Sequence, residues 1–79
     1  MSELILFSRD GCHLCDDMLF ALQSLAGQHR FEVHVVDIDA SRSLSKALNA
    51  AIPLLMLNGQ VVSQYHLDYA KLQEALGLS

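Results

Sequence analysis

The sequence predicts a small α/β domain, in which helices cover both faces of a four-stranded mixed sheet and the elements follow the order β-α-β-α-β-β-α. Two short segments, residues 4–7 and 53–57, are apolar throughout, which is typical of central strands in a covered sheet. Elsewhere, apolar residues recur at the three- and four-residue spacing of amphipathic helices. Asn58-Gly59 is the strongest short signal for a hairpin, here between the third and fourth predicted strands.

The first half of the chain predicts a strand, a helix and a second strand. Residues 4–7 form the first strand, and residues 8–11 form a turn in which Asp10 is a suitable helix cap. Helical spacing then runs to Gly27, a typical C-terminal stop. The apolar positions of this helix are Cys15, Met18, Leu19, Leu22, Leu25 and Ala26. Residues 31–36 read as a half-exposed strand, which completes a right-handed crossover unit.

The second half predicts a short helix, a hairpin and a last helix. Ser41 opens the short helix. After the hairpin, residues 60–63 return antiparallel, and a helix with apolar positions from Tyr65 to Leu76 follows. Because the two fully apolar strands belong at the centre and the two mixed strands at the edges, the predicted strand order is 2-1-3-4.

Composition and charge limit the classes of partner. Residues 1–79 are predicted to form a single domain, and an apolar fraction of 52% lets so short a chain build its own core. A net charge of −4 leaves no basic stripe for nucleic acid. The longest apolar run, residues 50–57, is too short to span a membrane, so no membrane partner is expected. The amino-terminus lacks the basic start of a secretory signal, which predicts a cytoplasmic protein, with a monomer as the default state.

Cys12 and Cys15 are the two cysteines of the chain, and they lie two residues apart between a predicted strand and a predicted helix. The start of a helix presents unpaired N–H groups and the positive end of its dipole. This environment favours the thiolate, which is the nucleophilic form of cysteine. A Cys-x-x-Cys pair in this setting is typical of a redox-active dithiol.

A zinc site is the competing interpretation of the same cysteines. The spacing from Cys12 and Cys15 to His29 and His34 fits a two-Cys, two-His zinc finger. Such fingers place their cysteines on a hairpin and their histidines on a helix, whereas here the cysteines begin a helical pattern and His34 lies in a strand pattern. The periodicity therefore favours the redox dithiol.

Residues 6–15, Leu-Phe-Ser-Arg-Asp-Gly-Cys-His-Leu-Cys, resemble the active-site segment of glutaredoxins. Ala51-Ile52-Pro53 is similar to their Thr-Val-Pro segment, and Asn58-Gly59 falls at their hairpin. The closest resemblance is to the small bacterial glutaredoxin-like family of the thioredoxin superfamily that carries Cys-His-Leu-Cys. This implies a minimal thioredoxin/glutaredoxin fold. The chain departs from the family pattern at Leu14, where dithiol glutaredoxins usually carry Tyr, and at Ser63 and Gln64, where their Gly-Gly falls.

The resemblance implies a thiol–disulfide oxidoreductase in which Cys12 forms a mixed disulfide that Cys15 resolves. It implies a cis peptide bond before Pro53, and the residues expected to contact substrate are Arg9, His13, Leu14, Ile52 and Pro53. No bound cofactor or metal is expected, and glutathione is a candidate reductant or co-substrate. The expected partners are a disulfide-bearing protein or glutathione as substrate and a reductase. The alternative is a non-enzymatic metal-binding or interaction module that uses the same dithiol.

Overall fold

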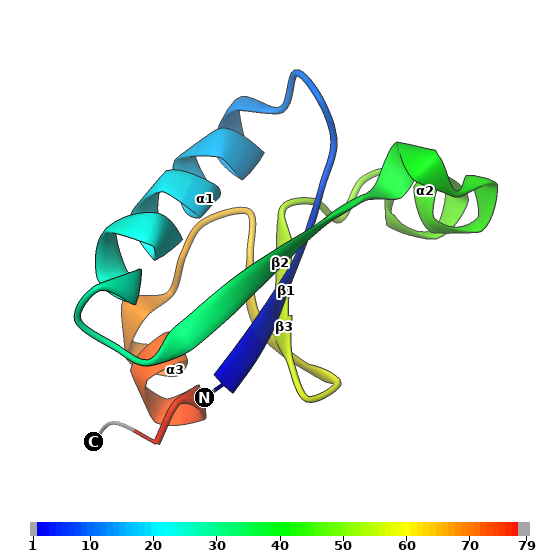
Figure 1. The fold of residues 1–79 in the computed structure, drawn as a ribbon. Coiled ribbons are helices and arrows are strands. Elements are labelled where there is room, and N and C mark those ends of the chain that lie inside the picture. The colour runs from blue at the N-terminus through cyan, green and yellow to red at the C-terminus, as the bar shows by residue number, and fades with distance from the viewer. Residues whose placement is uncertain (1, 78–79) are drawn as a thin grey trace.

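A computed structural model describes residues 2–77 of the chain. Its sheet has the order β2-β1-β3-β4, in which β1 (Ser2–Ser8) pairs in parallel with β2 (Phe31–Asp37). β3 (Leu54–Leu57) runs antiparallel to β1, and β4 (Gln60–Gln64) runs antiparallel to β3. The predicted fold class, element order and strand order are confirmed (Figure 1).

The main core lies between the sheet and two helices, α1 (His13–Ala26) and α3 (Tyr69–Ala75). Alternate residues of β1 point to this face, where Leu4 and Leu6 are completely buried. The helices contribute side chains from one stripe each, as amphipathic helices do. The buried members of this cluster are Leu4, Leu6, Met18, Leu22, Phe31, Leu55, Leu57, Val62 and Leu72.

The second face of the sheet is covered only at one end, by the short 3-10 helix η1 (Ile38–Ala40) and by α2 (Arg42–Leu48) (Figure 1). Ile38 and Leu54 are buried there, outside the main cluster. At the other end of the face, Ile5 stays 39% exposed. The sequence predicted a first strand covered on both faces, and this prediction is wrong at Ile5 because α2 is too short to reach it.

Two predicted boundaries change for reasons of local hydrogen bonding. Cys12, and not Asp10, caps α1, because its sulfur accepts the backbone N–H of Cys15. The last helix does not include Tyr65, which has a left-handed φ of 66°; it begins at Tyr69, after Asp68 accepts the backbone N–H of Lys71. Within residues 2–77, no helix combines the length and the apolar character needed to cross a bilayer.

The predicted hairpin at Asn58-Gly59 is confirmed. Both residues have positive φ angles, 52° and 79°, as a tight turn between twisted antiparallel strands requires. Glycine adopts this conformation without steric cost, and asparagine tolerates it better than most residues. The turn therefore fixes the register in which β4 returns along β3.

Candidate active site

The two cysteines lie at the amino-terminal end of α1, in the segment that follows the carboxyl end of β1. Cys12 and Cys15 are joined by a disulfide, with 5.2 Å between their Cα atoms. The sulfur of Cys12 accepts the backbone N–H of Cys15 at 3.1 Å. This N–H belongs to the first turn of the helix and has no partner within the helix, so it is available to the sulfur.

The two sulfurs differ in their access to solvent. Cys15 lies in the first turn of α1 and is 1% exposed, whereas Cys12 is only partly buried. A substrate disulfide can therefore reach Cys12 more readily than Cys15. The backbone N–H of Cys15 would also donate to a Cys12 thiolate after reduction, and charge-assisted hydrogen bonds of this kind are stronger than neutral ones.

Pro53 lies beside the end of β1, because the register pairs Phe7 with Leu54. The Ile52–Pro53 peptide bond is cis, and Pro53 is buried while Ile52 is partly exposed. The segment before β3 thus lies at the same end of the sheet as the loop that carries the cysteines (Figure 1).

Three hydrogen bonds, donated by Gln64 at the end of β4 and by Tyr65 directly after it, hold the segment around Ile52 in place. We call these three hydrogen bonds the strap. The backbone N–H of Tyr65 donates to the carbonyl of Pro53 at 2.8 Å. The Tyr65 hydroxyl donates to the carbonyl of Ala50 at 2.6 Å, and Nε2 of Gln64 donates to the carbonyl of Ala51 at 3.2 Å. The strap fixes the backbone on both sides of Ile52, since it binds the two residues before Ile52 and the one after it.

The guanidinium of Arg9 donates hydrogen bonds to three side chains of residues 39–49, the segment that contains η1 and α2. Nε and Nη2 donate to the two carboxylate oxygens of Asp39 at 3.1 and 2.6 Å. Nη1 donates to Asn49 at 2.6 Å, and Nη2 also donates to the hydroxyl of Ser45 at 3.4 Å. Arg9 therefore ties the loop before the cysteines to η1 and α2, and these four hydrogen bonds leave one of its five N–H groups for a substrate carboxylate.

The Arg9–Asp39 pair keeps both groups charged. The hydrogen bond from Arg9 holds the pKa of Asp39 below its ordinary value, in spite of partial desolvation. The hydrogen bond to Asp39 likewise raises the pKa of Arg9. Both side chains remain partly accessible to water, so the pair is a surface ion pair with bidentate geometry.

A shallow groove of about 160 Å³ runs from the first turn of α1 to the segment between β4 and α3. Its walls are largely apolar or aromatic, with one carboxylate and one imidazole at the margin. Leu14, of the segment between the cysteines, is exposed at one wall, and His13 is exposed beside it. The full lining is Leu14, Asp17, Met18, Ala21, Tyr65, His66, Leu67 and Tyr69.

Residues 3–77 match the family model described as Glutaredoxin-like domain (DUF836). The chain belongs to this family. The fold places its two cysteines, the Pro53 segment and the strap at one end of the sheet, as described above. No curated protein sequence matches the chain.

Solved structures show how this glutaredoxin-like domain compares with known folds. The solution structure of protein Ne2328 from Nitrosomonas europaea is 29% identical, with a TM-score of 0.76, and the match covers 96% of this chain and 87% of that one. Protein XcR50 from X. campestris is 28% identical, with a TM-score of 0.68 and coverage of 96% and 97%. Thioredoxin 1 from Thermosipho africanus is 16% identical, with a TM-score of 0.63 and coverage of 95% and 90%, a similarity of fold alone.

The sequence analysis missed the strap and the partners of Arg9. Tyr65 fits the helical spacing of the last helix, and nothing in the sequence signals its left-handed backbone. Asp39, Ser45 and Asn49 follow Arg9 by 30 to 40 positions, so only the crossover from β2 to α2 brings them to it. The conventional capping residue Ser41, by contrast, was visible as a helix-start signal, whereas the cap at Asp68 was not predicted.

Proposed function

We propose that this glutaredoxin-like domain is a thiol–disulfide oxidoreductase that works through a Cys12 mixed disulfide resolved by Cys15. The observation that carries the proposal is the unequal burial of a bonded pair. Cys12 is accessible and sits at the cap of α1, while Cys15 is enclosed within bonding distance of it. An attacking thiol must meet the substrate, whereas a resolving thiol needs only to reach its neighbour.

The exchange proceeds in two balanced steps. The Cys12 thiolate attacks one sulfur of the substrate disulfide, that bond breaks, and the first substrate thiolate leaves. The Cys15 thiol then loses its proton and attacks the Cys12 sulfur, which forms the Cys12–Cys15 disulfide and releases the second substrate thiolate. Two electrons pass to the substrate, whose thiolates take up protons from solvent. Glutathione or a reductase then reduces the protein disulfide.

The surroundings of Cys12 favour a protein disulfide over glutathione as the substrate. The groove beside Leu14 is lined mainly by apolar and aromatic side chains, which suits an apolar side chain of an extended polypeptide. Glutathione carries two carboxylates, whereas Asp16 and Asp17 lie in the first turns of α1 and Arg9 is already bound to Asp39. We place the reaction in the cytoplasm, where reduced thiol pools keep such a dithiol active.

A redox titration in glutathione buffers, with thiol trapping and intact mass, tests the proposal. The expected result is the loss of two hydrogen atoms per chain with a midpoint of roughly −200 to −270 mV, the range of reducing members of this superfamily. Cys12→Ser is expected to abolish turnover, and Cys15→Ser to accumulate a mixed disulfide with the substrate. Turnover by Cys12→Ser, or a dithiol that never oxidises across the buffer range, would refute the mechanism.

Leu14→Ala tests the choice of substrate. Removal of the leucine side chain from the groove is expected to lower kcat/KM for a peptide disulfide with apolar flanks by about tenfold, the usual effect of a lost apolar contact. Reduction of glutathione disulfide should change little. Phe20→Ala is the matched control, because Phe20 lies on the same helix, is 73% exposed and does not line the groove. Equal losses on both substrates would contradict the groove as a specificity site.

A further inference from the structure

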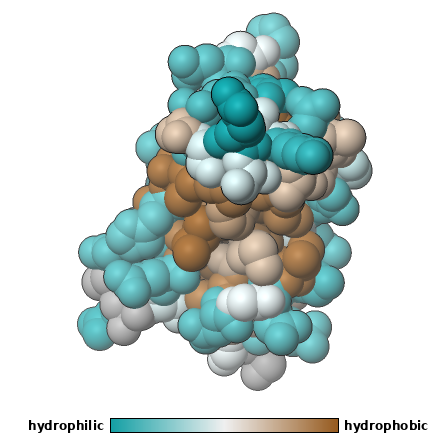
Figure 2. Space-filling view, turned by 90° about the vertical axis from the view of Figure 1, so that its right-hand side faces the viewer, coloured by the Kyte–Doolittle hydropathy of each residue, from teal (hydrophilic) through white to brown (hydrophobic). Residues whose placement is uncertain are grey.

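The uncovered end of the second sheet face forms an apolar surface that we call the open face. It comprises Ile5, Val36, Met56 and Val61, and the strand register places them on the side opposite to α1 and α3. Ile5 and Val61 are 39% and 45% exposed. Figure 2 looks onto this side and shows an apolar patch below the hydrophilic side chains at the α2 end.

The floor of the open face is hollowed. A groove of about 480 Å³ runs across β1 and β2 to the β3–β4 hairpin, and Ile5 and Val36 line it together with polar groups at its margin. An exposed apolar patch with a polar rim is a feature of interaction sites on small domains. The depression would receive a protruding element of a partner.

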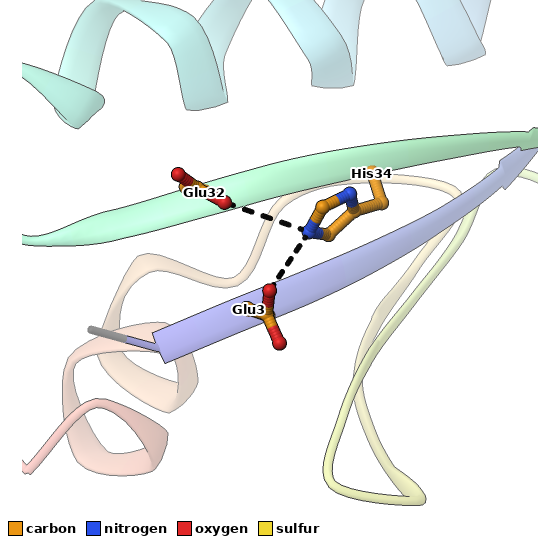
Figure 3. Close-up of side chains that lie close together, drawn as sticks. All are labelled: Glu3, Glu32 and His34. Atoms are coloured by element: carbon orange, nitrogen blue, oxygen red, sulfur yellow. Dashed lines mark ion pairs between the residues drawn. The ribbon is translucent and has the colours of Figure 1, made fainter.

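One end of the open face is acidic. Glu3 and Glu32 are neighbours in the parallel register, and both lie next to His34 (Figure 3). Nε2 of His34 is 3.4 Å from Oε1 of Glu3 and 3.7 Å from Oε2 of Glu32. All three side chains are more than half exposed. The cluster therefore offers carboxylates to a cationic partner at this end.

The other end carries α2, which stands out from the sheet (Figure 1). Leu44 and Leu48 are partly buried and lie on one side of α2, whereas Arg42 and Lys46 are exposed and lie on the opposite side, one helical turn apart. Ala47 is also exposed on this outer surface. The outer side of α2 is therefore cationic.

We propose that the open face is a docking surface for a second copy of this chain, related by a two-fold axis. Each copy has a protruding cationic helix at one end of the face and an acidic, hollowed, uncovered sheet at the other. The two-fold axis lies in the plane between the two copies and runs across the line from α2 to the acidic end. It therefore lays α2 of each copy on the open face of its partner, with Arg42 and Lys46 toward Glu3 and Glu32. Such an interface is self-complementary, as closed dimers require.

The reciprocal seating would have to bury about 800 Å² on each copy, which is the area typical of a stable dimer. The reciprocal seating covers both the apolar sheet and the outer side of α2. This state departs from the monomer expected from the sequence, and it leaves Cys12 outside the interface, at the amino-terminal end of α1 on the other face.

Sedimentation equilibrium of the reduced, unmodified chain tests the proposal. With dithiothreitol present to prevent intermolecular disulfides, the mass is expected to rise from 8.7 kDa to twice that value between about 1 μM and about 1 mM protein. Higher salt is expected to weaken the association, because exposed charge pairs are screened. A monomer at every concentration, or growth beyond the dimer without closure, would overturn the proposal.

Charge exchange locates the interface. Glu32→Lys and Lys46→Glu are each expected to raise the dissociation constant about tenfold or more, because the two-fold axis repeats every lost pair. When the two variants are mixed, their opposite surfaces match again, so a heterodimer should form more tightly than either homodimer. Failure of the mixture to associate more tightly overturns the assignment of these partners.

Matched substitutions of two valines test whether the dimer forms through the open face or through the opposite face of the sheet. Val61→Glu places a charge on the open face and is expected to abolish the dimer. Val35→Glu adds the same charge at a position that is 50% exposed, but on the face toward α1, and it should leave the dimer intact. The reverse result overturns the proposal. Unchanged dithiol oxidation in both variants would show that redox function and self-association are separate.

Discussion

Tyr65→Phe tests whether the strap positions the Pro53 segment for substrate. The substitution removes one hydroxyl, and with it the 2.6 Å hydrogen bond to the carbonyl of Ala50. A hydrogen bond of this kind contributes about 0.5–1.5 kcal/mol. Because Tyr65 is 42% exposed and Ala50 is also exposed, water can replace part of the bond, and we expect the lower half of that range. The backbone bond to Pro53 and the bond from Gln64 remain.

The expected cost translates into two measurable changes. For a domain of this length, about 0.5–1 kcal/mol lowers Tm by roughly 2–8 °C. If the strap also orders the backbone beside Ile52, kcat/KM for a peptide disulfide should fall several-fold, about fivefold for 1 kcal/mol. The midpoint potential of the dithiol should not change, because the lost bond touches neither cysteine.

Tyr69→Phe provides the control for this prediction. Tyr69 lines the same groove and is 54% exposed, but it does not belong to the strap. Differential scanning calorimetry, steady-state kinetics and the redox titration would be run on both variants. Equal effects of the two substitutions, or a shifted midpoint potential in Tyr65→Phe, would show that the hydroxyl of Tyr65 does not position the Pro53 segment.

Two further predictions concern stability. The lowered pKa of Asp39 means that its ion pair stabilises the fold above the ordinary carboxyl pKa of 3.8 and that this contribution is lost as the pH falls through the lowered value. In thermal unfolding between about pH 2 and pH 6, Asp39→Asn should therefore be less stable than the natural chain near pH 6 and converge with it at the acid end; a difference that grows toward acid pH would contradict the assigned sign. Leu22→Ala should cost about 2–5 kcal/mol in urea unfolding, because Leu22 is completely buried in the main core, whereas Phe20→Ala on the exposed side of the same helix should change stability by about 0.5 kcal/mol or less. Similar losses of stability in both alanine variants would show that the core does not lie on the Leu22 side of α1.

Much of the fold followed from local pattern. Residues 4–7 and 53–57 are apolar on both faces, which was enough to place their strands at the centre and to give the order of the sheet. The Asn58-Gly59 turn was readable because few other residue pairs adopt its backbone angles readily. These signals depend only on residues that are close together in the sequence, so they can be recognised without the tertiary structure.

Local pattern was misleading where a distant element decided the outcome. Tyr65 has helical spacing to Tyr69, yet its hydroxyl and N–H bind the segment before β3, and this holds it outside α3. Ile5 belongs to an apolar strand, yet it is exposed because the crossover helix that should cover it has only seven residues. Asp10 was a reasonable cap by residue type, but the chain turns into the helix two residues later.

Residue spacing and periodicity were sufficient to predict that Cys12 and Cys15 lie at a strand–helix junction in a domain with this strand order. They did not reveal which sulfur is accessible, that Arg9 is bound to Asp39 and Asn49, or that one end of the sheet has no cover. The physical reason is that burial and long-range hydrogen bonds depend on the lengths and placement of elements far apart in the chain, which periodicity does not encode.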